Sequence, residues 1–223
     1  MATTVHERPQ NGTPRLADNS GRAGFGSNLP AEGTLRALED HPIEPSQTGI
    51  WVALAAITMS FAALTSALVV REGAGMDWQH IALPPILFLN TLTLLGSSAT
   101  LEIARRRITV YARVQEGHIA TPMSWLAATL GLGILFVAGQ YVAWLRLKAE
   151  GLYLATNPNS SFFYVFTGVH AVHVLGGLAG LIYVMRKLRG SILRRSTFAA
   201  AAQYWHFMGL LWLYLLFLLW TRL

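Results

Sequence analysis

Three histidines in apolar sequence are the residues whose type and spacing could support chemistry. His170 and His173 lie in the run FFYVFTGVHAVHVLGGLAG, residues 162–180, and His206 lies in another apolar run. Imidazoles can bind a metal or haem, but no carboxylate accompanies these three to complete a metal site. A haem needs axial ligands on opposite sides, and only His206 could face the other two. We therefore interpret all three as hydrogen-bonding groups between helices or toward lipid, with metal or haem ligation as the alternative.

The first two histidines share one helix face with two glycines. At ~100° per residue, His170, His173, Gly177 and Gly180 fall on the same side of a helix. Glycines let another helix approach closely, and imidazoles are costly in hydrocarbon unless they face protein or water. This pattern predicts packing against the last apolar segment, near the YWHF sequence at residues 204–207.

Other chemical signatures are missing from the sequence. It contains no nucleophile–base set, no phosphate loop and no paired buried carboxylates, which predicts no catalytic, cofactor or metal residue in this chain. Glu102 precedes Arg105 and Arg106 at i+3 and i+4, which predicts a local ion pair, with proton transfer as the alternative. Asn90 and Gln140 are interpreted as hydrogen-bonding groups between helices, with a transport path as the alternative.

Composition indicates a membrane protein. Of the 223 residues, 53% are hydrophobic and 13% are charged, against roughly 25% charged in soluble domains. The net charge of +6 does not indicate nucleic-acid binding, because the basic residues lie in short loops between apolar runs. The absence of cysteine excludes disulfides, iron–sulfur clusters and thiolate metal sites.

The apolar runs predict an all-α integral-membrane bundle of five transmembrane helices. Each run is close to the ~20 residues that cross a bilayer. The expected spans lie near 49–70, 82–104, 123–147, 161–185 and 199–221, within one domain, 49–223. Residues 1–48 are polar and predict a disordered or extended arm, with docking to a partner as the alternative. No secretory signal is visible at the start.

The loops predict orientation through the positive-inside rule. The loops after the second and fourth spans hold Arg105, Arg106, Arg107, Arg113, Arg186, Lys187, Arg189, Arg194 and Arg195. The loops after the first and third spans mix their few cations with acids. We therefore expect a cytoplasmic N-terminus and a C-terminus outside.

Small or weakly polar stripes predict which helix faces pack together, because lipid provides no hydrophobic force between helices. The expected stripes are Ala53, Ala56, Ser60, Ala63 and Ala67; Asn90, Thr93, Ser97, Thr100 and Ala104; and Gly133, Phe136, Gln140 and Trp144. The aromatic residues of the last span are expected to face lipid or a partner.

From about residue 47 to 223, the chain resembles subunit III of the haem–copper terminal oxidases. Two motifs carry the resemblance: NPNSSFFYVFTGVHAVHVLGGL at residues 157–178, and YWHF at 204–207 before an aromatic-rich helix. Five spans resemble the short bacterial form, which lacks the first two helices of the seven-helix version.

The resemblance implies an accessory subunit of a respiratory complex in the bacterial inner membrane. That complex reduces dioxygen to water and pumps protons through its catalytic subunit, with haem and copper in the partner subunits. The implied partners are catalytic subunit I, subunit II, a small subunit IV as a further candidate, cytochrome c as electron donor, and structural phospholipid. The resemblance implies that His170, His173, Trp205 and His206 belong to the core between helices, not to catalysis.

Three acids that are common in this family are missing. Their places are taken by Ile57, Ala143 and Gly209, which favours a structural and lipid-binding role over a proton relay. A quinol oxidase subunit III and an accessory protein of a nitric oxide reductase are the close alternatives. A small transporter is the alternative from another class, although no inverted repeat or mid-span proline supports it.

Overall fold

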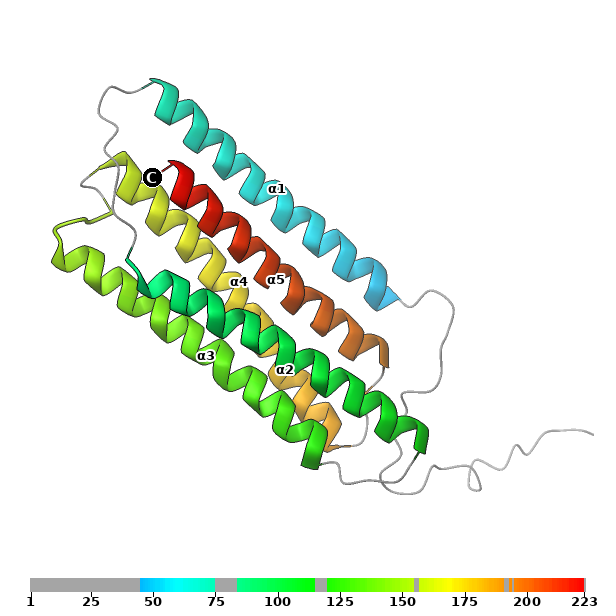
Figure 1. Ribbon diagram of the computed structural model, residues 1–223. Helices are drawn as coiled ribbons and strands as arrows, with labels where there is room; N and C mark the ends of the chain where they lie inside the picture. Colours follow the sequence, from blue (N-terminus) through cyan, green and yellow to red (C-terminus); the bar gives the residue numbers. More distant parts are fainter. Residues whose placement is uncertain are drawn as a thin grey trace, which may run out of the picture. The chain divides into compact units, whose positions relative to one another are not determined.

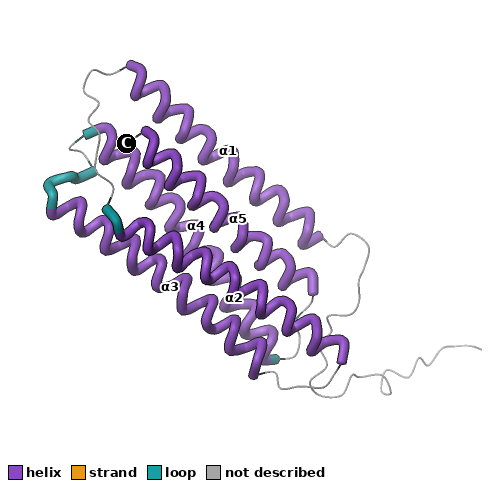
Figure 2. Tube along the Cα trace, viewed as in Figure 1, coloured by secondary structure: helices purple, strands orange, loops and turns teal. Residues whose placement is uncertain are grey.

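The computed structural model describes residues 45–74, 84–114, 120–154, 157–190, 193 and 195–222 (Figure 1). These residues form five helices and, within the described ranges, no strand (Figure 2). The helices are α1 (Pro45–Ala74), α2 (Ile86–Val114), α3 (Ala120–Ala149), α4 (Pro158–Arg189) and α5 (Arg195–Arg222). All five are long and apolar enough to cross a membrane. The prediction of an all-α bundle with five spans is confirmed.

Every helix is longer than its predicted span, because backbone hydrogen bonding continues where the apolar run ends. The α2 helix continues through the charged turn at 105–107, beyond the predicted end at 104. The α2 start lies after Pro84 and Pro85, whose carbonyl oxygens accept the N–H groups of Leu87 and Phe88. Pro158 opens α4, where a missing N–H has no cost. Residues 1–44 of the predicted arm, 1–48, lie outside the described residues. The last four residues of that range belong to α1, which begins at Pro45.

Consecutive helices run in opposite directions, so α1 and α5 run parallel to each other (Figure 1). The α2–α3 pair has the most extensive contact, and α5 packs against α1, α2 and α4. The α1 and α5 helices are joined at two levels. Thr65 and Tyr214 share a hydrogen bond of 2.8 Å, and Arg222 Nη1 lies 3.2 Å from Glu72 Oε2.

The packing face of α1 differs from the prediction. Its buried residues are large: Leu54, Ile57, Phe61 and Leu68. The predicted small-residue stripe, Ala53 to Ala67, lies on a neighbouring face of the helix and is exposed. The prediction for α1 was wrong within this chain, because α1 meets its neighbours through large side chains such as Phe61, whose ring packs near Phe166 and His173 of α4.

The stripes of α2 and α3 do pack as predicted. Ser97 donates a hydrogen bond to the Thr129 carbonyl oxygen across the interface, at 3.1 Å. Thr100 and Thr129 share a hydroxyl–hydroxyl bond of 2.9 Å. On α3, Phe136 and Gln140 are buried, and Trp144 reaches α4. Short side chains therefore set the spacing of this pair.

Candidate functional site

The contact between α4 and α5 is centred on Gly177. A methyl group built at Gly177 would lie 3.0 Å from Trp205 Cε3 and 3.1 Å from Tyr204 Cε1. The predicted close approach is therefore present, and it involves the YWHF sequence. Gly180, predicted on the same face, has open space around it. The tight contact thus occupies about one turn of α4.

Trp205 of α5 contacts three other helices, and its contact with α4 is the one at Gly177. Its indole N–H donates to Ser97 Oγ on α2 at 3.0 Å. Its ring also lies over Gly133 on α3, where an added methyl group would be 2.8 Å from Trp205 Cη2. Trp205 is buried, so its N–H needs this partner. Trp205 therefore lies in the interior of the bundle, between helices.

His170 lies deep in the bundle. Its side chain is 1% exposed. Its ring lies 5.9 Å from the Phe136 ring of α3 and 5.2 Å from the Trp212 ring of α5, measured between ring centroids. His170 therefore lies in the core of the bundle, and its surroundings are aromatic.

His173 is held differently from His170. Its Nδ1 lies 2.7 Å from the Val169 carbonyl oxygen of its own helix. Its ring faces Phe61 of α1, with 5.9 Å between centroids. The Tyr204 hydroxyl donates to the His173 carbonyl oxygen at 3.0 Å. The two histidines of the motif thus face different neighbours and do not form a ligand pair.

His206 departs from its expected place in the core, since it is exposed on α5. Consecutive residues of a helix are separated by ~100°, so burial of Trp205 turns His206 outward. Among the described residues, no group of three histidine, cysteine or acidic side chains is arranged to hold a metal ion. Of the three histidines, only His170 is fully buried.

Asn90 and Gln140 are both buried inside the bundle. Asn90 packs directly on Gly139 of α3, where an added methyl group would lie only 2.0 Å from its Oδ1. This contact was not predicted, because an isolated glycine beside a glutamine has no distinctive pattern.

The aromatic last helix does not face outward throughout, which corrects the prediction. Trp205 and Trp212 are among the largest fully buried side chains, whereas Phe217 and Trp220 are exposed. The Trp212 indole N–H donates to Thr91 Oγ1 on α2 at 3.0 Å. A partner hydroxyl on a neighbouring helix makes tryptophan burial possible, and that partner is not visible from the α5 sequence.

The three positions of the missing acids all lie inside the bundle. Ile57 and Ala143 are part of the apolar core. Gly209 is buried and lies close to Ser98, whose Oγ would be 3.4 Å from an added methyl group. The predicted ion pair lies at the end of α2, where Glu102 accepts from Arg105 at 2.7 Å and from Arg106 at 3.1 Å.

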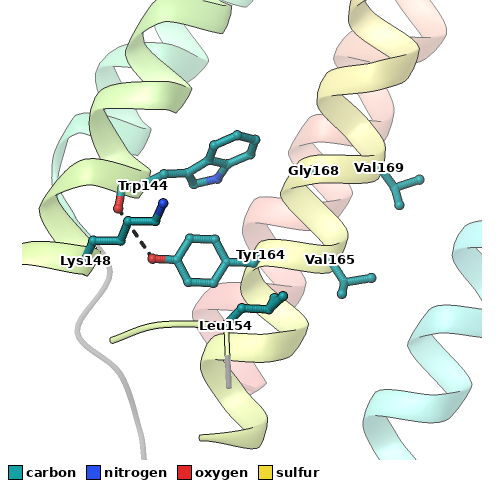
Figure 3. Close-up of a pocket in the computed structure, with 7 residues that line it drawn as sticks. All are labelled: Trp144, Lys148, Leu154, Tyr164, Val165, Gly168 and Val169. Carbon is teal, nitrogen blue, oxygen red and sulfur yellow. Dashed lines mark hydrogen bonds between the residues drawn. The ribbon is translucent and has the colours of Figure 1, made fainter. Parts of the chain in front are cut away.

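A groove of about 450 Å³ lies between the end of α3 and the start of α4 (Figure 3). Trp144 and Lys148 line it from α3, and Tyr164 and Gly168 from α4. An added methyl group at Gly168 would touch nothing within 4 Å, so this wall is open. The lining is mostly apolar, with one amine at the end of a span. Sequence reasoning identified Trp144 but not the other three residues.

Two hydrogen bonds hold the aromatic side chains that line this groove in place. The Trp144 indole N–H donates to Thr167 Oγ1 at 3.0 Å, which orients the ring along α4. The Tyr164 hydroxyl donates to the Leu152 carbonyl oxygen at 2.8 Å, which holds the connection between α3 and α4. The aromatic walls of the groove are therefore positioned before any ligand binds.

Comparison with known proteins agrees with this architecture. The family described as cytochrome c oxidase subunit III matches residues 50–222. Cytochrome c oxidase subunit 3 of Corynebacterium diphtheriae is 30% identical over 146 residues, which cover 64% of this chain and 66% of that protein. The probable cytochrome c oxidase subunit 3 of Nocardia farcinica is 31% identical over 126 residues, which cover 55% of this chain and 59% of that protein.

A third relative extends the match along the chain. Cytochrome c oxidase subunit 3 of Synechocystis is 30% identical over 178 residues, covering 76% of this chain and 72% of that protein. The first two matches cover less than two thirds of the relatives' length, but the family match includes all five helices. On this match and this five-helix architecture, the chain belongs to the cytochrome c oxidase subunit III family.

Proposed function

We propose that this chain is the accessory third subunit of a respiratory haem–copper oxidase in a bacterial inner membrane. In this proposal the partner subunits I and II hold the haem and copper, and a small subunit IV is a further candidate partner. Cytochrome c donates the electrons, and the catalytic subunit couples oxygen reduction to proton pumping. This chain stabilises the complex and holds phospholipid. The family match over all five helices carries the proposal.

The interior supports a structural role. The places where acids are common in the family hold Ile57, Ala143 and Gly209, which are buried. An apolar interior gives no carboxylate for a proton relay at these positions. The buried Trp205 and Trp212 of α5 instead each donate a hydrogen bond to a hydroxyl of α2. Such links between helices are expected for a rigid accessory subunit.

The groove between α3 and α4 supports phospholipid binding. Its apolar wall, with open space over Gly168, suits an acyl chain. Lys148 is the residue before the last residue of α3, where its ammonium group can meet a lipid phosphate at the membrane surface. Tryptophans near span ends favour the same interface, and Trp144 lies in this groove.

One comparison tests this role. Oxidase would be purified from cells with the parent chain, with Lys148→Gln, and with the control Arg146→Gln, another exposed cation of the same turn. We expect the Lys148 variant to lose one tightly bound phospholipid per complex by mass spectrometry. We also expect a severalfold shorter activity half-life during turnover, with the initial rate unchanged. Unchanged lipid content and half-life in the Lys148 variant would contradict the proposed role of the groove.

A further inference from the structure

We propose that an ordered water molecule is bound between Gln140 of α3 and His170 of α4, in the interior of the bundle. Both side chains are 1% exposed. Neither amide atom of Gln140 and neither ring nitrogen of His170 has a hydrogen-bond partner in the part of the chain that the structure describes. Buried polar atoms are almost always hydrogen-bonded to protein or to ordered water. Four such atoms on two facing helices indicate a bound solvent site.

The contacts on either side of Gln140 place it on the face of α3 that packs against α4 near His170. Trp144, one turn after Gln140, donates to Thr167, which precedes His170 by three residues. Phe136, one turn before Gln140, contacts the His170 ring itself. Because α3 and α4 are antiparallel (Figure 1), the Gln140 side chain lies on the α3 surface between these two contacts. The Gln140 amide and the His170 imidazole therefore lie in the same interface, between α3 and α4.

The chemistry of the two groups suits water. The Gln140 amide offers donors and an acceptor, and a neutral imidazole offers one donor and one acceptor. One water molecule can accept from either side chain and donate to the other. Buried waters typically make two to four such bonds and occupy polar sites. The neighbouring rings of Phe136 and Trp212 offer the His170 N–H no oxygen or nitrogen acceptor that could replace this water.

The proposal concerns only the interior of this chain, so it does not depend on the partners of the chain. The test is a cryo-electron microscopy map of the full chain in the complex with which it purifies, at a resolution that shows ordered water. We expect a separate peak about 2.7–3.2 Å from one amide atom of Gln140 and from one ring nitrogen of His170. A direct hydrogen bond between the two side chains, or a map with no peak between them, would overturn the proposal.

A variant identifies the peak. Gln140→Met removes both amide atoms while keeping a side chain of similar length, so the peak should disappear and α3 and α4 should stay in place. The control is Gln203→Met, since Gln203 is only half-buried and lies on α5, and it should leave the peak unchanged. His170→Phe should also remove the peak, which covers the case in which the Gln140 variant does not accumulate. A peak that survives either of these two changes would contradict the site.

Discussion

At Gly177 the absence of a side chain decides how two helices meet. Trp205 and Tyr204 of α5 lie against the bare α4 backbone, at distances that leave no room for a larger residue. In lipid, such close van der Waals packing is a main source of helix association. The indole N–H of Trp205 also donates to Ser97 of α2, and its ring covers Gly133 of α3, so this one residue of α5 contacts three other helices.

Gly177→Leu should therefore disrupt the contact between α4 and α5. The new side chain must displace Trp205, and overpacking of this kind costs typically about 1–3 kcal/mol. We expect a lower yield of assembled complex and a lower thermal unfolding temperature of this chain, measured in the purified membrane complex.

Gly180→Leu is the matched control, because it lies one turn along the same helix and an added methyl group there touches nothing within 4 Å. It should assemble like the parent. Equal yields of assembled complex from the Gly177 and Gly180 variants would show that close contact between α4 and α5 at Gly177 is not needed for assembly.

The fates of His170 and His206 show what residue patterns can predict. The helical period placed His170 on a packing face, and it is buried. His206 shared a motif with Trp205, but neighbours in sequence point in different directions. Which of the two faces inward depends on Ser97 and Gly133 of other helices. This tertiary information is not contained in the motif.

At the scale of elements, five long apolar runs were enough to predict five helices and their order. Their pairing was predicted only in part. The small stripe of α2 marks a real interface, because its hydroxyls find partners on α3. The similar stripe of α1 is exposed, since large residues on the other face contact α4 and α5. Composition alone does not distinguish these two outcomes.

The register of α2 and α3 can be tested by crosslinking, since the chain has no cysteine. The hydroxyl oxygens of Thr100 and Thr129 lie 2.9 Å apart, close to the geometry in which two sulfur atoms bond at about 2.05 Å. The pair Thr100→Cys and Thr129→Cys should form a disulfide in high yield after mild oxidation, detected as linked peptides by mass spectrometry.

Thr100→Cys combined with Ser124→Cys is the control pair. Ser124 is exposed and lies about 7.5 Å closer to the start of α3 than Thr129. This pair should remain reduced. A control pair that forms the disulfide as readily as the test pair would contradict the register.

At the scale of the whole molecule, we propose that the α1 start faces the cytoplasm and the α5 end faces outside. Five spans place these two ends on opposite sides of the membrane. The cations in the C-terminal parts of α2 and α4 favour the cytoplasmic side for those helix ends.

Single cysteines can test this orientation, because both chosen positions are exposed. In intact spheroplasts, Glu150→Cys should react with a membrane-impermeant maleimide. Arg107→Cys should react only after the membrane is opened. Labelling in the reverse order would contradict the proposed topology.

The most direct test of the account is a mild-detergent purification of this chain from its native membrane, analysed by absorption spectroscopy and mass spectrometry. If this chain is an oxidase subunit, oxidase subunits I and II should co-purify with it in stoichiometric amounts, with the absorption bands of haem and with bound copper. A chain that purifies alone, without haem-containing partners in any mild detergent, would contradict its assignment as an oxidase subunit.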